Sequence, residues 1–293
     1  MKPKDMLMLL LLAALWGGSF LFMRMAAPVL GPVWLIEARI LLAGLALLPL
    51  LFRRNPWPQV KEKISALVVV GCIGSAFPFL LLAFASLTLP AGVTSIINAT
   101  TPLFGIAIAT LFYSETFTLN RLLGIVLGFV GVVVLIGWQR FVFSPMLVAA
   151  IVAGLGASTM YAIVAPYAKK HLSELSSLTN TTISLLCGAI ALMPLLPFTA
   201  PTTLPSPAIV LAVLALALLS TSLAYLLYFN LLQSIGPTKV LTVTYLIPAF
   251  AMVWGFFILD EPITAPMVLG CGLILVGTAF ANDLLKPRRK AKF

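Results

Sequence analysis

Hydroxyl and aromatic side chains recur inside long apolar stretches of this sequence, where they could hold a small solute. Thr221, Tyr225 and Tyr228 are spaced at i, i+4 and i+7, so a helix presents all three on one face. Hydrogen-bonding groups on such a face would be wasted against lipid, which favours a polar cavity. Helix packing and an interfacial aromatic belt are the alternative interpretations. Three aromatic residues in other apolar stretches could add walls to the same cavity: Trp16, Phe79 and Tyr161.

Two prolines lie within apolar stretches and are expected to kink the helices there. Pro102 cannot donate to the carbonyl of Asn98, and Pro248 cannot donate to that of Thr244, so both carbonyls are freed. Freed carbonyls and hydroxyls suit an ammonium group, while helix amino ends suit a carboxylate. The alternative is that the prolines only bend helices, with Ser, Thr and Asn side chains bonding locally. The substrate-binding candidates here are Asn98, Thr101, Thr244 and Tyr245, with Thr94 beside them.

Charged residues at membrane depth are functional candidates by default. Glu37 and Arg39 lie inside the apolar stretch 33–52. At 1.5 Å per residue they are only about 6 to 10 Å from the outer end of that stretch, so snorkelling or mutual pairing is the alternative. Glu115 and Glu261 begin or precede other apolar stretches, where a carboxylate would cap the amino end of the following helix.

The composition requires a membrane protein. Of 293 residues, 61% are hydrophobic and 9% are charged, and the mean hydropathy is +1.14. A soluble domain carries roughly 25% charged residues, so this chain cannot cover a water-facing surface. No alternating pattern indicates a β-barrel, and about 20 apolar residues cross a bilayer as a helix. We therefore expect an all-α integral membrane protein with ten transmembrane helices, at approximately 6–25, 33–52, 64–86, 91–113, 119–138, 145–167, 176–197, 207–232, 237–259 and 265–285.

The positive charges are distributed as a topology signal. The net charge of +10 is scattered in small groups at the ends of apolar stretches, so no nucleic-acid partner is expected. With both termini in the cytoplasm, 15 of the 18 lysines and arginines lie at cytoplasmic ends. An odd number of spans would place the basic tail outside and spoil this bias. The three remaining basic residues are Arg24, Arg39 and Arg140.

The sequence contains no pattern typical of an enzyme or a cofactor protein. Cys72, Cys187 and Cys271 lie inside apolar stretches without a CxxC pair or a nearby His, so neither disulfides nor a zinc site are expected. There is no GxxxxGK[ST] phosphate loop and no constellation of nucleophile, acid and base. We expect no cofactor, no metal and no enzymatic activity. The basic start followed by an apolar stretch is interpreted as an uncleaved first helix.

The second half of the sequence repeats the first. At a constant offset of 146, Pro102 matches Pro248 and Glu115 matches Glu261. Each half then holds five helices, and an odd number of helices inverts the second copy in the bilayer. The loop with Glu115 is therefore expected to be cytoplasmic and the loop with Glu261 to face outward.

The repeat predicts the domain organisation. We expect a first five-helix unit at 1–138, a second, inverted unit at 145–285 and a basic cytoplasmic tail at 286–293. The last helix of each unit carries glycines that suit close helix contact, although a dimer seam is an alternative. These glycines are Gly124, Gly128, Gly131, Gly270 and Gly277.

Several of these motifs resemble the drug/metabolite transporter superfamily, in particular its EamA-type ten-helix exporters. The matching pieces are LWGGSF at 15–20, Arg39 within WLIEARILLAG, and a doubled pattern of Pro, Glu and Gly: TTPLF, SETFT and LLG, then LIPAF, DEPIT and VLG. The likeness covers essentially the whole chain. It departs at the second-half match of Trp16-Gly17-Gly18, which reads Leu155-Gly156-Ala157.

The resemblance implies export of amino acids or other small metabolites through a central cavity in the bacterial inner membrane. The aromatic interior is most similar to the YddG-type exporters of aromatic amino acids. We expect facilitated export by alternating access without tight ion coupling, by a monomer or homodimer whose partners are its small-molecule substrate and membrane lipid. The alternatives are a proton-coupled drug or metabolite efflux carrier, an antiporter of phosphorylated or nucleotide sugars, and a channel.

Overall fold

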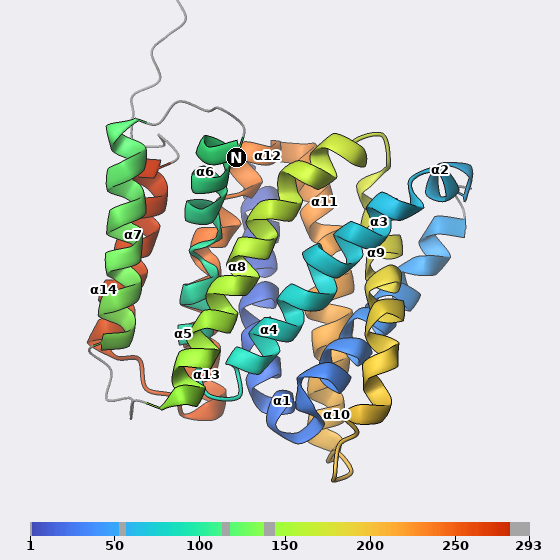
Figure 1. Cartoon of the computed structure of the whole chain (residues 1–293), viewed down its shortest axis with the longest axis horizontal. Helices are drawn as coiled ribbons and strands as arrows, with labels where there is room; N and C mark the ends of the chain where they lie inside the picture. The colour runs from blue at the N-terminus through green and yellow to red at the C-terminus, as the bar shows by residue number, and fades with distance from the viewer. Residues whose placement is uncertain (1, 53–56, 113–117, 138–143, 282–293) are drawn as a thin grey trace, which may run out of the picture.

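The computed structural model describes residues 2–52, 57–112, 118–137 and 144–281, and this part of the chain contains helices and connecting turns (Figure 1). Seven of its helices are long and apolar enough to cross a membrane, and two more are apolar but shorter. With this composition the helices must bury their backbone polar groups within themselves, as lipid requires. The protein is therefore a multi-pass, all-helical membrane protein.

The first helix, α1 (Pro3–Phe52), consists of two arms. Gly31 has φ 72° and ψ 154°, which is not a helical conformation, and φ in this range favours glycine because it lacks a Cβ. Figure 1 shows the chain running down from the N-terminus and back up toward α2 (Trp57–Glu62) on the other side of this break. The predicted segments 6–25 and 33–52 are these two arms.

Two spans contain π-helical stretches at matching places of the sequence repeat. One comprises α3 (Ile64–Gly71), η1 (Cys72–Ala76) and α4 (Phe77–Ala85). The other comprises α10 (Pro207–Leu214), η3 (Ala215–Leu223) and α11 (Ala224–Ile235). Shifted by 146 residues, η1 falls on 218–222, inside η3. Because π-turns are rare and frequently mark functional sites, their recurrence makes both spans candidate functional segments.

The two proline-containing spans are interrupted, but at different places. The first breaks between α5 (Ala91–Asn98) and α6 (Thr101–Phe112), directly before Pro102. The second breaks between α12 (Pro237–Val240) and α13 (Val243–Leu259), and α13 continues through Pro248. The two interruptions therefore do not fall at equivalent positions of the repeat, although Pro102 and Pro248 do. The remaining elements are α7 (Leu119–Gly137), α8 (Pro145–His171), α9 (Ser177–Leu192), η2 (Met193–Phe198) and α14 (Ala265–Ala281).

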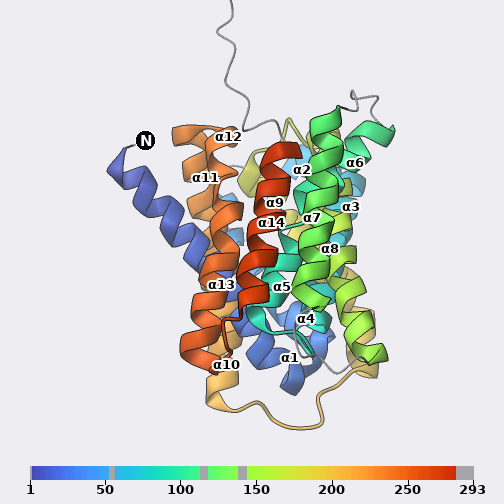
Figure 2. The same ribbon diagram turned by 90° about the vertical axis from the view of Figure 1, so that its left-hand side faces the viewer.

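Helices α7 and α14 pack against each other along most of their length, as Figures 1 and 2 both show. A Cβ on Gly277 would lie 2.6 Å from the carbonyl oxygen of Gly124, and one on Gly270 would lie 2.8 Å from that of Gly131. The two helices are therefore antiparallel and touch backbone to backbone. The prediction that these glycines serve close helix contact is confirmed.

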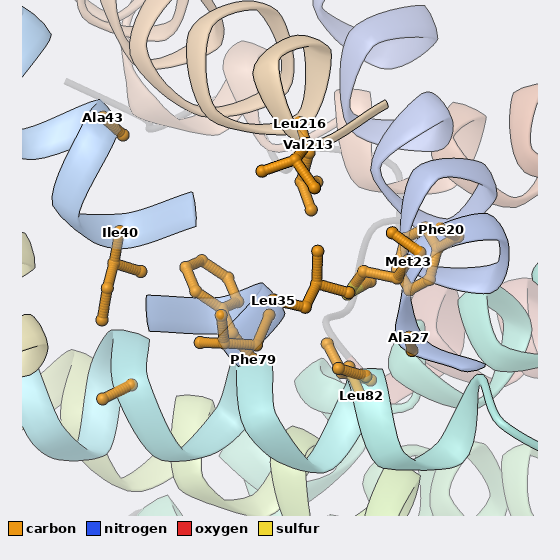
Figure 3. Packing of buried hydrophobic residues seen from close by; sticks show 14 of the residues in the cluster. Phe20, Met23, Ala27, Leu35, Ile40, Ala43, Phe79, Leu82, Val213 and Leu216 are labelled. Carbon is orange, nitrogen blue, oxygen red and sulfur yellow. The ribbon is translucent and has the colours of Figure 1, made fainter. Parts of the chain in front are cut away.

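The core of the molecule forms where both arms of α1 meet the other helices. Gly17 allows α13 to approach, since a Cβ there would lie 2.9 Å from the amide nitrogen of Ala251. Figure 3 shows Met23, Leu35 and Phe79 meeting between the ribbons of α1 and α4. This cluster of buried side chains is apolar, and two of its members, Met23 and Phe79, contact the charged side chain of Arg39.

Candidate functional site

Arg39 is buried, with only 4% of the residue exposed. Its Nε donates to the hydroxyl of Thr221 over 3.1 Å, and its Nη1 lies 3.7 Å from the sulfur of Met23. The guanidinium carbon stands 3.6 Å from the centre of the Phe79 ring, a cation–π distance. The side chain therefore points into the protein rather than toward an interface, and the snorkelling alternative is wrong.

The π-helical stretch η3 places Thr221 for this contact. The Thr221 hydroxyl donates over 2.8 Å to the carbonyl of Leu216, five residues earlier, and Ser222 donates to Ala217 in the same way over 3.1 Å. With its own hydrogen committed to the helix, the Thr221 oxygen can accept from Arg39. Thr221 is fully buried, so the pairing is shielded from water.

Aromatic residues surround the same position. Phe79 contacts Tyr161 edge-on with ring centres 6.3 Å apart, and the hydroxyls of Tyr161 and Tyr225 interact electrostatically with Arg39. Trp16 lies 6.3 Å from Tyr225 and 5.6 Å from Tyr228 between ring centres. We call this set the Arg39 cluster: Arg39, Trp16, Phe79, Tyr161, Thr221, Tyr225 and Tyr228.

The Arg39 cluster draws its members from both halves of the sequence. Helices α1 and α4 supply three of them, and α8, η3 and α11 supply the other four. The contacts join all six hydroxyl and aromatic residues that the sequence predicted as cavity walls. Such an arrangement offers one cation, several hydroxyls and broad ring faces, which together can bind a small organic solute.

Glu37 is also buried, at 4% exposure, but it does not pair with Arg39. Neither of its carboxyl oxygens has a hydrogen-bond partner among the described residues. The two side chains are two residues apart on a helix and so leave it in different directions. The alternative of mutual pairing is therefore wrong, and Glu37 is a second buried ionisable group.

The residues around the two prolines form hydrogen bonds outside the Arg39 cluster. The carbonyl of Asn98, which Pro102 leaves free, accepts from the hydroxyl of Thr101 over 2.7 Å. It also accepts from Ser158 over 3.4 Å, and Thr244 donates back to Leu241 over 2.7 Å. No hydrogen bond or ring contact in the described part of the chain joins these residues to the Arg39 cluster. The set left outside the cluster is Asn98, Thr101, Pro102, Thr244, Tyr245 and Pro248.

Glu261 connects three elements at one end of the helices. Its Oε2 accepts from the amide of Ala91 over 2.9 Å, and its Oε1 lies 3.3 Å from Nε of Arg24. Arg24 also donates to the carbonyls of Ser86 and Leu87, over 2.8 and 2.9 Å. We call this set the Arg24–Glu261 bridge.

The bridge corrects the expected role of Glu261. Its carboxylate caps the amino end of α5, where unpaired amides and the helix dipole attract negative charge, and not the amino end of α14. Its repeat partner, Glu115, lies outside the described residues.

A second group of charges lies at the opposite end of the molecule. Lys63 stands 3.1 Å from a carboxyl oxygen of Glu62 and 3.2 Å from one of Glu174. These hydrogen bonds raise the pKa of Lys63. The two glutamate side chains are 70% and 74% exposed, so water and salt screen the pairs and they contribute little stability.

Comparison with known proteins places the chain among transporters. The sequence profile of the EamA-like transporter family matches twice, over residues 4–137 and 148–282. An uncharacterized transporter of Archaeoglobus fulgidus is 30% identical over 89% of this chain and 91% of its own length. An uncharacterized inner membrane transporter of Escherichia coli, YedA, is 23% identical over 89% of this chain and 85% of its own.

A solved crystal structure shares the fold. It aligns with a TM-score of 0.65 over 97% of this chain and 98% of that chain, at 18% sequence identity. The arrangement of helices described above is therefore one that an experimentally determined protein also adopts.

Proposed function

We propose that this chain, which belongs to the EamA-like transporter family, exports small metabolites, in particular aromatic and other neutral amino acids, across the bacterial inner membrane. The observation that carries the proposal is the Arg39 cluster, because its ring faces and hydroxyls come from both halves of the chain and suit an aromatic solute. The name of the Escherichia coli relative, an inner membrane transporter, supports the location.

We propose that the chain crosses the membrane ten times, with both termini in the cytoplasm. Seven helices satisfy the length and hydropathy of a span when α1 is counted once. Its two arms on either side of Gly31 add one span, and the shorter apolar helices α13 and α14 add two. An even count keeps the basic tail on the same side as the N-terminus, as the distribution of positive charge favours.

The two five-helix halves are proposed to be inverted copies. Three observations support this: the family profile matches twice, η1 and η3 recur at matching places, and α7 and α14 meet symmetrically. At the seam between α7 and α14, Gly124 contacts Gly277 and Gly131 contacts Gly270. In the repeat, Gly124 corresponds to Gly270 and Gly277 corresponds to Gly131. The first contact therefore becomes the second when the two halves are exchanged, as a twofold axis in the membrane plane requires.

Transport is proposed to occur by rocking of one half against the other. A site built from both halves is exposed to one side and then the other as their contact changes, without the two openings coexisting. We propose facilitated export down the solute gradient. A second candidate, proton-coupled efflux, is favoured by the buried and unpartnered carboxyl of Glu37.

Solute flux in liposomes separates these candidates. If export is uncoupled, flux of a labelled solute is the same with and without a pH gradient, and Glu37→Gln behaves like the parent. A strict requirement for the gradient that Glu37→Gln abolishes would establish proton coupling instead. Saturable exchange of labelled for unlabelled solute distinguishes either carrier from a channel.

Tyr225→Ala is expected to reduce flux of aromatic amino acids at least about tenfold, because it removes a ring that contacts Trp16 inside the cluster. Asn98→Ala serves as the matched polar variant outside the cluster and is expected to leave flux within about twofold of the parent. Purified protein in liposomes, assayed across a panel of amino acids, measures both. Equal behaviour of the two variants on every transported compound would remove the cluster as the binding site.

Single cysteines on either side of α9 are expected to be accessible from opposite sides of the membrane. Ser173 precedes this helix, Thr202 follows η2 after it, and both residues are exposed. Helix α9 runs from one end of the structure toward the other (Figure 1). In whole cells, a membrane-impermeant maleimide should label Thr202→Cys and not Ser173→Cys, in a background whose three native cysteines are replaced. The reverse pattern would invert the proposed orientation, and labelling of both in intact cells would contradict it.

A further inference from the structure

The positive charge of Arg39 has no counter-ion among the described residues. None of the ion pairs found there involves this side chain. Its direct contacts within the described part of the chain are a neutral hydroxyl, a thioether and a ring. A cation deep in a membrane span is unfavourable unless it is paired, and sulfur is a weak hydrogen-bond acceptor. The structure therefore holds a buried charge whose strong partner must come from elsewhere.

The free part of the guanidinium suits a carboxylate. Phe79 covers one face of the group and Thr221 occupies Nε, so the two terminal nitrogens still lack a strong acceptor. These two nitrogens form the fork that binds both oxygens of a carboxylate at once. A phosphate group carries more charge and is held by several basic residues, whereas the Arg39 cluster contains one.

The neighbours of Arg39 indicate the chemistry of the rest of the solute. The hydroxyls of Tyr161 and Tyr225 are close enough to Arg39 to interact with it electrostatically, and Trp16 extends the aromatic surface beyond Tyr225. These side chains can pack on an aromatic or apolar body. The Arg39 cluster contains no acidic residue, so it offers nothing charged to an ammonium group.

We infer that Arg39 binds the carboxylate of the transported solute, so that the site takes monocarboxylates with an aromatic or apolar body whether or not they carry an amino group. This inference rests on the proposed function and narrows its substrate class. The carboxylate is the group that the protein recognises, and the amino group of an amino acid contributes little to binding.

Three small compounds of similar size test the inference. Phenylalanine carries both groups, 3-phenylpropionate lacks the amino group, and phenethylamine lacks the carboxylate. Their binding is measured on the purified full chain by calorimetry, and their flux is measured in liposomes. The first two are expected to bind with affinities within about threefold of each other, and phenethylamine at least about tenfold more weakly.

Substitution of Arg39 is the second part of the test. Arg39→Gln is expected to weaken carboxylate binding about 10- to 100-fold and to abolish the preference over phenethylamine. Arg39→Lys retains the charge without the fork, so the preference should persist at reduced affinity. Lys63→Gln, which removes a positive charge outside the cluster, is the matched control and should match the parent. Thermal unfolding of each variant verifies that it is folded. If Arg39→Gln does not fold, the binding measurements on Arg39→Lys test the role of Arg39 instead.

The outcomes separate the two proposals. If the parent binds phenethylamine as well as phenylalanine, or a folded Arg39 variant keeps full carboxylate affinity, the role of Arg39 is overturned while the proposed carrier stands. If the parent neither binds nor carries any of the carboxylates, both proposals fall.

Discussion

Gly277→Leu lowers the free energy of unfolding by about 3 kcal/mol and reduces the yield of folded protein, because the seam between α7 and α14 has no room for a side chain. A Cβ on Gly277 would lie 2.6 Å from the carbonyl oxygen of Gly124 and 2.7 Å from the amide nitrogen of Gly128. These are backbone atoms, so the two helices must separate to accommodate the change. Thermal unfolding and size-exclusion chromatography in detergent measure the effect.

The same helix offers a matched control. A Cβ on Gly272 would meet no atom within 4 Å, so Gly272→Leu is expected to leave stability unchanged within about 0.5 kcal/mol. The symmetry of the seam adds a further expectation. Gly131 matches Gly277 in the repeat, and a Cβ on it would lie 2.8 Å from the carbonyl oxygen of Gly270, so Gly131→Leu should be as damaging as Gly277→Leu. Equal tolerance of leucine at Gly272 and Gly277 would contradict the backbone contact.

Glu261→Gln is expected to destabilise the protein by about 2 kcal/mol and to loosen the end of the molecule where the Arg24–Glu261 bridge lies. The substitution keeps the shape of the side chain but removes the charge that pairs with Arg24 and caps α5. The side chains of Arg24 and Glu261 are 30% and 14% exposed, so solvent screens the pair only in part. Chemical unfolding measures the stability, and maleimide labelling of a cysteine at Leu87 measures the loosening.

The neighbouring carboxylate is the control for Glu261. Asp260→Asn removes the same charge one residue earlier, at a residue with φ 53° that asparagine tolerates, and no ion pair to it is found in the described part of the chain. It is expected to change neither stability nor labelling. If both variants behave alike, the loss of one negative charge at this end of the molecule, and not the loss of the Arg24–Glu261 bridge, explains the effect.

Much of the site could be predicted from the sequence because helical spacing is a local property. Thr221, Tyr225 and Tyr228 share a face whatever surrounds the helix, and the structure finds them beside Trp16 and Arg39. The prolines were less informative. A freed carbonyl is satisfied by the nearest hydroxyl, as Thr101 satisfies that of Asn98, and the spacing of residues does not reveal this competition.

The burial of Arg39 could not be predicted for a related reason. Its depth along one helix is compatible with snorkelling, pairing or burial, and the choice depends on what the neighbouring helices present to it. The available signal was the presence of an arginine within an apolar stretch, which is unfavourable there and so marks a functional candidate.

Composition, helical period and the repeat offset by themselves determined that this is a helical membrane protein with a polar aromatic face and glycine-rich helices, since these properties depend on neighbours within a few turns. Only the tertiary structure decided which groups meet. Arg39 bonds to Thr221, 182 residues away, and Ala91 bonds to Glu261, 170 residues away. Such contacts form where apolar helices from distant parts of the chain pack closely. Because a buried polar group cannot bond to water, its hydrogen-bond partners are the groups that this packing places next to it.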